Sequence, residues 1–277
     1  MSHNTLAAAA AFLFSLLIID PPAADAQSAL DLIKSRGVLV VATDPDWPPA
    51  SWRKEDGQFD GFDVDVSQEV ARRLGVRVQF YMPYSFEEVL SGNWGGKWDI
   101  ATSVTPTVQR AEKVQFAAVY YYGPSSLAVH RDNGAIQEPS EASGKRIGVV
   151  EGTEYEKYLT REPFDIFDMP PFTYKIEQPH IVKFKDEDAL YASLAKGNGA
   201  EIDGIIDATD TLMQKINDGS PFRIVGQPLT YTPSSIVVNR GEDTLAAALK
   251  EIIDAMHKDG TLTRLSLKWF EYDLSQY

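Results

Sequence analysis

Short apolar runs alternate with amphipathic segments along this chain, and this alternation constrains the fold more than any other feature. Residues 38–42 are a continuous, mostly β-branched apolar run, typical of a buried strand. Residues 64–74 place apolar side chains at helical spacing and stop before Gly75, and residues 76–80 alternate as a half-buried strand does. Strands and helices that alternate at this pace indicate parallel strands joined by crossover helices.

The same alternation occurs a second time after Gly144. Residues 146–150, 181–184 and 202–206 are predicted strands, and residues 186–195 are a predicted helix. A chain of 277 residues has room for two α/β lobes of roughly 100 residues each. We therefore expect a ligand site in the crevice between two lobes, at the carboxyl ends of strands.

The N-terminus carries the pattern of an export signal. Residues 6–19 are an apolar, alanine-rich run too short to span a bilayer comfortably. Ala24, Asp25 and Ala26 fit the small-x-small pattern of a cleavage site, so residues 1–26 are a predicted signal peptide. Residues 1–5 hold no Lys or Arg, and a disordered or membrane-anchoring N-terminus is the alternative. The chain has no cysteine, which excludes lipid attachment at the cleavage site and any disulfide.

Charge and motifs exclude several classes of function. The formal net charge of -14 argues against nucleic acid and anionic membrane surfaces as partners. The sequence holds no nucleophile elbow, no phosphate-binding loop and no pair of histidines at metal-ligand spacing. We therefore expect no catalytic residue, no cofactor and no metal ion.

An arginine follows closely spaced hydroxyls in residues 105–110, Thr-Pro-Thr-Val-Gln-Arg. A guanidinium binds both oxygens of a carboxylate and hydroxyls add donors, so Arg110 and Thr105 are candidates for a carboxylate receptor. The same pattern also fits a helix cap followed by a solvated arginine.

Motifs over nearly all of the remaining chain point, in order, to one family. They are residues 37–49 (GVLVVATDPDWPP), 61–66 (GFDVDV), 98–100 (WDI) with 105–110, 144–153 (GKRIGVVEGT), 202–204 (IDG), 259–262 (DGTL) and 268–270 (KWF). The chain thereby resembles the type II periplasmic solute-binding proteins of ABC importers. Within them it is similar to the cluster that includes the histidine-, lysine/arginine- and glutamine-binding proteins.

The resemblance implies an α/β, two-lobed periplasmic binding protein type II fold, with two hinge strands and the ligand cleft between the lobes. By that pattern the first lobe comprises residues 28–122 and 232–277, and the second residues 123–231. The hinges then fall near residues 123–125 and 231–233. The resemblance also implies a periplasmic monomer that captures a small zwitterion, foremost an amino acid, by lobe closure. The protein would deliver this ligand to the membrane subunits of an ABC permease.

The resemblance also assigns ligand-binding residues. Those implied for the ligand's α-carboxylate are Arg110, Thr102, Ser103, Thr105 and the Gly152–Thr153 turn. This turn opens a helix, where free N–H groups favour an anion; plain helix capping is the alternative. Those implied for the ligand's side chain are Asp44, Trp47 and Phe86, with Trp52 either lining the pocket or exposed. Ring contacts there are worth about 0.5–2 kcal/mol.

Asp207 is the implied acceptor for the ligand's α-ammonium group, with Asp210 in reserve. Asp207 also fits the N-cap of the next helix. The chain is one residue shorter than the family pattern between residues 203 and 207, and again between residues 99 and 105. Since a one-residue shift turns the side chains of a strand to its other face, the register at both places stays open.

Rival functions and one extra segment complete the expectations. Relatives on this fold include cyclohexadienyl and prephenate-type dehydratases, for which Glu151 and Glu154 are the candidate acids here. The sequence is also compatible with a binder of a small carboxylate that lacks an amino group, and with a sensor for a membrane receptor. Residues 160–180 are longer than the family's usual link and hold four prolines, which exclude a regular helix throughout. This segment is a lid, a docking surface or neither.

Overall fold

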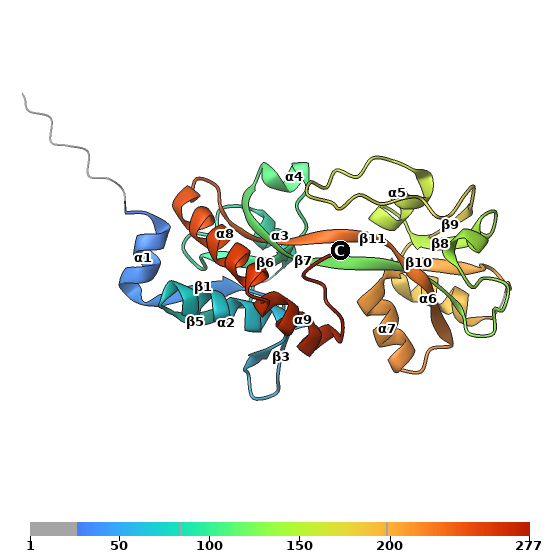
Figure 1. Cartoon of the computed structure of the whole chain (residues 1–277), viewed down its shortest axis with the longest axis horizontal. Helices are drawn as coiled ribbons and strands as arrows, with labels where there is room; N and C mark the ends of the chain where they lie inside the picture. The colour runs from blue at the N-terminus through green and yellow to red at the C-terminus, as the bar shows by residue number, and fades with distance from the viewer. Residues whose placement is uncertain (1–26, 84, 198) are drawn as a thin grey trace, which may run out of the picture.

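The computed structural model describes residues 27–83, 85–197 and 199–277. Two lobes lie end to end along the long axis of the molecule (Figure 1). The predicted signal peptide, residues 1–26, lies outside the described residues. Within the described ranges, no helix is long and apolar enough to cross a membrane.

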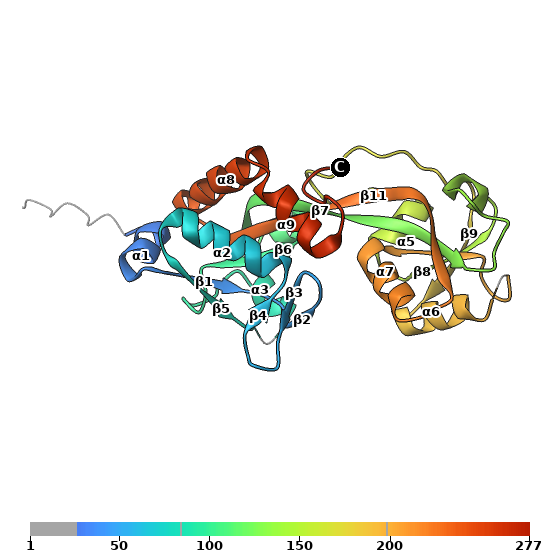
Figure 2. The same cartoon turned by 60° about the horizontal axis from the view of Figure 1, so that its bottom comes forward.

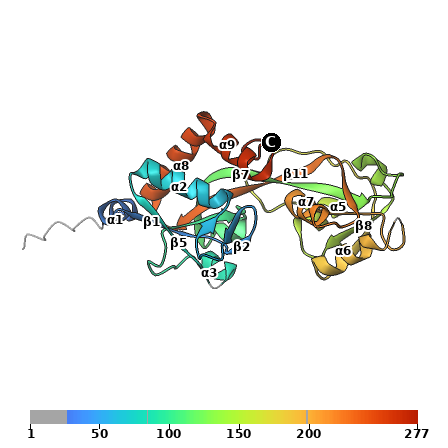
Figure 3. The ribbon, with the colours of Figure 1, turned by 90° about the horizontal axis from the view of Figure 1, so that it is seen from below.

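One sheet runs through both lobes, with eight strands in the order β5-β1-β6-β11-β7-β10-β8-β9 in the described part of the chain. Its central strands, β7 (Val114–His130) and β11 (Phe222–Asn239), are antiparallel and cross from one lobe to the other (Figure 3). Residues 123–125, a predicted hinge, pair with residues 230–232, just after a register shift that follows Val225. The lobe boundaries drawn through these residues stay a prediction.

The first lobe combines parallel strands with helices from both ends of the chain. Its strands are β1 (Val38–Ala42), β5 (Arg77–Tyr81) and β6 (Ile100–Val104). Its longer helices are α1 (Ala29–Arg36), α2 (Phe62–Leu74), α8 (Asp243–Lys258) and α9 (Thr261–Phe270). Their apolar faces form one core, in which side chains from residues 30–121 meet side chains from residues 236–274.

Short elements complete this lobe. They are the antiparallel strands β2 (Asp46–Trp47), β3 (Ser51–Arg53) and β4 (Phe59–Asp60), and the helices α3 (Phe86–Leu90) and α4 (Val108–Ala111). Helix α2 ends where Gly75 adopts a left-handed φ of 77° and its N–H reaches the Ala71 and Arg72 carbonyls. Local sequence thus sets the end of this helix.

The second lobe repeats the pattern with strands β8 (Arg146–Val150), β9 (His180–Phe184) and β10 (Gly204–Ala208). Its helices are η1 (Pro139–Ala142), α5 (Glu154–Thr160), α6 (Glu187–Ala195) and α7 (Thr209–Asn217). Two further apolar clusters form its core. The predicted α/β alternation is confirmed in both lobes, although β10 begins two residues later than predicted.

Candidate ligand-binding site

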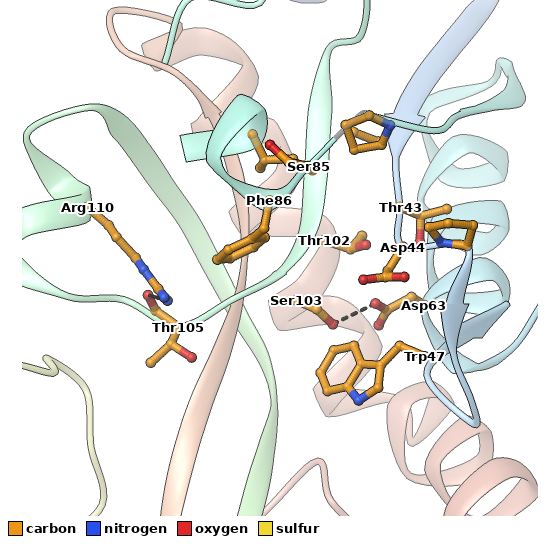
Figure 4. Close-up of a pocket in the computed structure, with 15 residues that line it drawn as sticks. Thr43, Asp44, Trp47, Asp63, Ser85, Phe86, Thr102, Ser103, Thr105 and Arg110 are labelled. Carbon is orange, nitrogen blue, oxygen red and sulfur yellow. Dashed lines mark hydrogen bonds between the residues drawn. The ribbon is translucent and has the colours of Figure 1, made fainter. Parts of the chain in front are cut away.

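A cavity of about 620 Å³ opens at the carboxyl ends of β1 and β6 (Figure 4). This is where a site in an open α/β sheet is expected. Its lining residues all belong to the first lobe: Ala42, Thr43, Asp44, Pro45, Trp47, Asp63, Pro83, Ser85, Phe86, Val89, Ala101, Thr102, Ser103, Thr105 and Arg110. Every residue predicted for the site in this lobe is among them. The predicted residues of the second lobe, Gly152, Thr153 and Asp207, do not line this cavity.

Arg110 and Thr105 lie at one end of the cavity (Figure 4). The Thr107 hydroxyl caps α4 by accepting the Arg110 N–H, and the Arg110 side chain donates from Nη1 to the Thr105 carbonyl at 3.0 Å. The guanidinium lies 5.1 Å from the centre of the Phe86 ring. Burial lowers the pKa of Arg110, which the charge of Glu154 opposes. Within the described ranges no carboxylate forms an ion pair with Arg110, so most of its fork is free to bind an anion.

Two exposed aromatic rings and an aspartate shape the rest of the cavity. Trp47 and Phe86 remain 37% and 44% exposed although both line it. Asp44 lies at the end opposite Arg110 (Figure 4), where its Oδ1 accepts the Asp46 N–H at 2.8 Å. The arrangement offers an anion receptor at one end and an acidic, aromatic environment at the other. Trp52, by contrast, packs edge-on against Trp269 at 5.4 Å and is not a lining residue.

A buried carboxyl, Asp63, lies beneath the cavity and holds Ser103. Asp63 accepts hydrogen bonds of 2.6 Å from the Tyr120 hydroxyl and from the Ser103 hydroxyl. The Ser103 N–H donates to the Tyr120 oxygen at 3.0 Å. Ser103 has a left-handed φ of 59°, which is rare for a residue with a side chain. Both donors of Ser103 are therefore engaged within the first lobe.

Asp63 belongs to the GFDVDV motif but was not predicted as a site residue. An acidic residue in the first turn of a helix is typical of simple dipole compensation, and Asp63 is in the first turn of α2. The sequence offered two signals that could have found it, namely the motif itself and the pair Tyr120 and Tyr121. Only the folded chain brings the Tyr120 hydroxyl to the carboxylate and the Tyr121 hydroxyl to Ser103.

Burial raises the pKa of Asp63 to about 6, against the hydrogen bonds from Ser103 and Tyr120. Since the folded protein then holds this proton more tightly than the unfolded chain, the contribution of Asp63 to stability is greatest below pH 4 and falls as pH rises through 6. We expect Asp63 alone to lower the unfolding free energy by about 2 kcal/mol between pH 4 and 7, because the unfolded chain is already partly ionised at pH 4. Urea unfolding of ligand-free protein, repeated across this pH range, measures the effect. The unfolding free energy should depend less steeply on pH in Asp63→Asn than in the wild-type protein.

The matched control is Asp56→Asn, which alters an exposed turn. It should keep the wild-type dependence on pH. If unfolding free energy depended on pH equally in Asp63→Asn and the wild-type protein, the raised pKa of Asp63 would be contradicted.

The Gly152–Thr153 turn caps α5, in line with plain helix capping. The Gly152 N–H donates to Glu156 Oε2 at 2.7 Å, and the Thr153 hydroxyl donates to the Val150 carbonyl at 2.7 Å. Thr153 also accepts the Glu156 N–H at 3.4 Å. These groups are engaged inside the second lobe, and their contact with a ligand stays a prediction.

Asp207 lies inside strand β10 and is only 5% exposed. The Tyr191 hydroxyl donates to its Oδ2, and the Ala208 N–H donates to its Oδ1 at 2.8 Å. Burial raises the pKa of Asp207 to about 6. The interpretation of Asp207 as an N-cap is wrong, because Ala208 is the N-cap of α7 and no side chain caps that helix. The reserve candidate Asp210 lines a separate groove of about 300 Å³, beside Trp269 and Tyr272.

The titratable side chains that line the cavity are Asp44, Asp63 and Arg110. The acids considered for a dehydratase, Glu151 and Glu154, are not among its lining residues. In the described ranges, no three His, Cys, Asp or Glu side chains gather as a metal site would require.

Comparison with known proteins shows the family to which the chain belongs. A family model described as bacterial extracellular solute-binding proteins, family 3, matches residues 39–272. The chain belongs to this family. One relative, the L-cystine-binding protein TcyJ of Escherichia coli strain K12, is 28% identical over 255 residues, which are 90% of this chain and 89% of the relative.

Solved structures of amino acid-binding proteins share the fold. The ancestral amino acid-binding protein AncCDT-1, described as a precursor of cyclohexadienyl dehydratase, matches with a TM-score of 0.60 and 26% identity, covering 88% of this chain and 99% of that one. The unliganded, open L-cystine solute receptor of Neisseria gonorrhoeae matches with a TM-score of 0.69 and 20% identity, covering 90% and 99%. The predicted two-lobed periplasmic binding protein fold is confirmed.

Proposed function

We propose that this protein is the substrate-binding component of an ABC importer and captures a free amino acid in the cavity described above. The observation that carries the proposal is the half-buried guanidinium of Arg110, which lies over the Phe86 ring. Among the described residues, the Arg110 side chain has only the Thr105 carbonyl as a hydrogen-bond partner. A carboxylate at this place completes the fork with charge-assisted hydrogen bonds. The relative named for L-cystine and the solved amino acid-binding protein AncCDT-1 support an amino acid as the ligand.

The ligand would lie along the cavity, with its carboxylate at Arg110 and its side chain toward Asp44 and Trp47. Closure of the second lobe would then bring Asp207 to the α-ammonium group and the Gly152–Thr153 turn to the carboxylate. We propose capture without a covalent step, by a monomer in the periplasm. The membrane subunits of a permease would recognise the closed form.

A thermal-shift screen of residues 27–277 against the standard amino acids, L-cystine and small organic acids tests the proposal. A ligand at about 100 times its dissociation constant adds about 2.7 kcal/mol to the unfolding free energy. We expect a shift with at least one α-amino acid. Shifts confined to acids without an amino group would instead favour a binder of small carboxylates, and purified protein must first be checked for a ligand that co-purifies.

Trp47→Ala should weaken amino acid binding roughly twofold to thirtyfold, because an exposed ring that lines the cavity contributes about 0.5–2 kcal/mol of stacking or cation–π energy. The loss should be larger for flat or cationic side chains than for alanine. Isothermal titration with a series of amino acids measures both effects.

The matched control is Trp52→Ala, since Trp52 packs on Trp269 outside the cavity. Affinity should stay near wild type in that variant. Equal losses in the two variants would argue against a side-chain slot at Trp47.

A further inference from the structure

Residues 161–179 leave the second lobe, touch the first lobe and return. They join α5 to β9, yet in Figure 1 this yellow-green stretch passes above β7 and β11 toward α4, and Figure 2 shows it as a separate connection between the lobes. Left-handed φ angles of 60°, 59° and 47° mark bends at Arg161, Asp168 and Gln178. The first and last lie at the ends of the segment, and the middle one lies beside the first lobe.

The segment attaches to the first lobe at the turn that carries Arg110. The Val108 N–H donates to the Asp165 carbonyl at 3.1 Å, and the Phe167 N–H donates to the Pro106 carbonyl at 3.1 Å. These bonds form an antiparallel bridge between Thr107 and Ile166. Thr107 is the residue whose hydroxyl caps α4, so the bridge holds the turn two or three residues from the ligand arginine.

One ring contact strengthens this attachment. Phe167 packs edge-on against Phe116 of β7, with ring centres 5.5 Å apart. Past Phe167, a cavity of about 560 Å³ is lined by residues 168–171 of the segment and by parts of β7 and α8. The bridge and the Phe167 ring supply the hydrogen bonds and the ring contact between this segment and the first lobe among the described residues.

The segment is fixed to the second lobe by stronger packing. Phe172 and Tyr174 contact the Tyr158 ring at 5.9 and 5.3 Å between centres. The Lys175 N–H donates to the Tyr158 oxygen at 2.8 Å, and Lys175 Nζ donates to the Pro228 carbonyl at 2.9 Å. The segment is therefore anchored to the second lobe on both sides of the residues that contact the first lobe.

We propose that residues 161–179 are a third connection between the lobes, whose bridge at Ile166 and Phe167 positions the Arg110 turn for the ligand. Ile166 and Phe167 are positioning residues, since they act on the ligand only through Arg110. The geometry of the arginine then depends on the separation of the lobes, a dependence that the two hinge strands alone do not provide. This inference rests on the proposed function of Arg110.

The test removes one backbone hydrogen bond and leaves the helix intact. Val108 is the first residue of α4, where proline is tolerated, and Thr107 before it is already extended with φ -111° and ψ 154°. Val108→Pro therefore deletes the N–H that Asp165 accepts, whereas Val108→Ala keeps it. Val108 is 59% exposed, so neither substitution disturbs the core.

Hydrogen exchange of the ligand-free protein provides a readout that needs no ligand. In Val108→Pro the amides of Phe167 and of residues 111–113 should exchange about fivefold faster than in Val108→Ala. Equal rates in the two variants, or faster exchange at Phe167 alone, would overturn the proposal. Phe167→Ala should act like Val108→Pro, with Asp165→Ala as its control, because that change removes an exposed ion pair to Lys157 and keeps the backbone carbonyl.

A second readout uses an equimolar pool of the twenty standard L-amino acids with L-cystine. The pool should raise the melting temperature of Val108→Ala more than that of Val108→Pro, and equal shifts would overturn the positioning role. Failure of the pool to shift wild-type protein would count against the proposed function, whereas the exchange rates judge the bridge independently.

Discussion

Arg110→Ala should lower amino acid affinity at least about thirtyfold. Truncating one partner of a desolvated, hydrogen-bonded charge pair costs about 2–5 kcal/mol, because the other charge is left unpaired. Arg110 is half-buried and the described residues supply it with no ion pair, so a ligand carboxylate loses its main partner in this variant. Isothermal titration with the amino acid found in the screen measures the loss.

Two further variants sharpen this experiment. Arg72→Ala removes an exposed arginine of α2 that pairs with Glu69. This variant should bind the amino acid with wild-type affinity. Arg110→Lys keeps the charge but not the planar fork, so its affinity should fall between those of wild type and Arg110→Ala. Wild-type affinity in Arg110→Ala would refute the assignment of the carboxylate site.

Asp207→Asn should weaken binding about as much as Arg110→Ala, by about 2 kcal/mol or more of binding free energy. The loss should occur only for ligands that carry an α-ammonium group. The carboxylate is buried beside Tyr191, and an ammonium group would be its first cationic partner in the described structure. Titration with an amino acid and with its analogue lacking the amino group separates the two effects. Equal losses for both ligands would remove Asp207 from this role.

The affinity of the wild-type protein should also depend on pH. With the pKa of Asp207 at about 6, the carboxyl is mostly protonated at pH 5 and pairs poorly with an ammonium group. Affinity should therefore fall roughly tenfold from pH 7.5 to 5. Asp207→Asn should lose this dependence, whereas Asp63→Asn should keep a dependence that arises from Asp207.

The fold could be predicted to a large extent because its periodicities are local. The spacing in residues 64–74 and the β-branched run of residues 38–42 each define an element without reference to the rest of the chain. The continuity of β7 and β11 could not be predicted this way. Pro124 in β7 and Pro228 and Pro233 in β11 interrupt the pattern of a strand, and only the pairing across both lobes reveals two long strands.

The residues of the site that lie in the first lobe could be predicted from the sequence. The position of the second-lobe residues relative to them could not. Asp44, Trp47, Phe86 and Arg110 share a cavity because each follows or precedes a strand that ends at the same edge of the sheet. How far Asp207 lies from that cavity depends on the angle between the lobes, which no local pattern encodes. Asp63 was missed because its partners Tyr120 and Ser103 are distant in sequence, so no local pattern links them to it.

The discontinuous first lobe has a consequence for how the chain acquires its structure. Its core joins side chains from residues 30–121 with others from residues 236–274, whereas the clusters of the second lobe are drawn from residues 127–229. As the chain emerges from a ribosome, the second lobe therefore has all its parts first. The core that α2 and β1 share with α8 and α9 is incomplete until those last helices have been made. The last helices of the chain thus act as the closing step of its assembly.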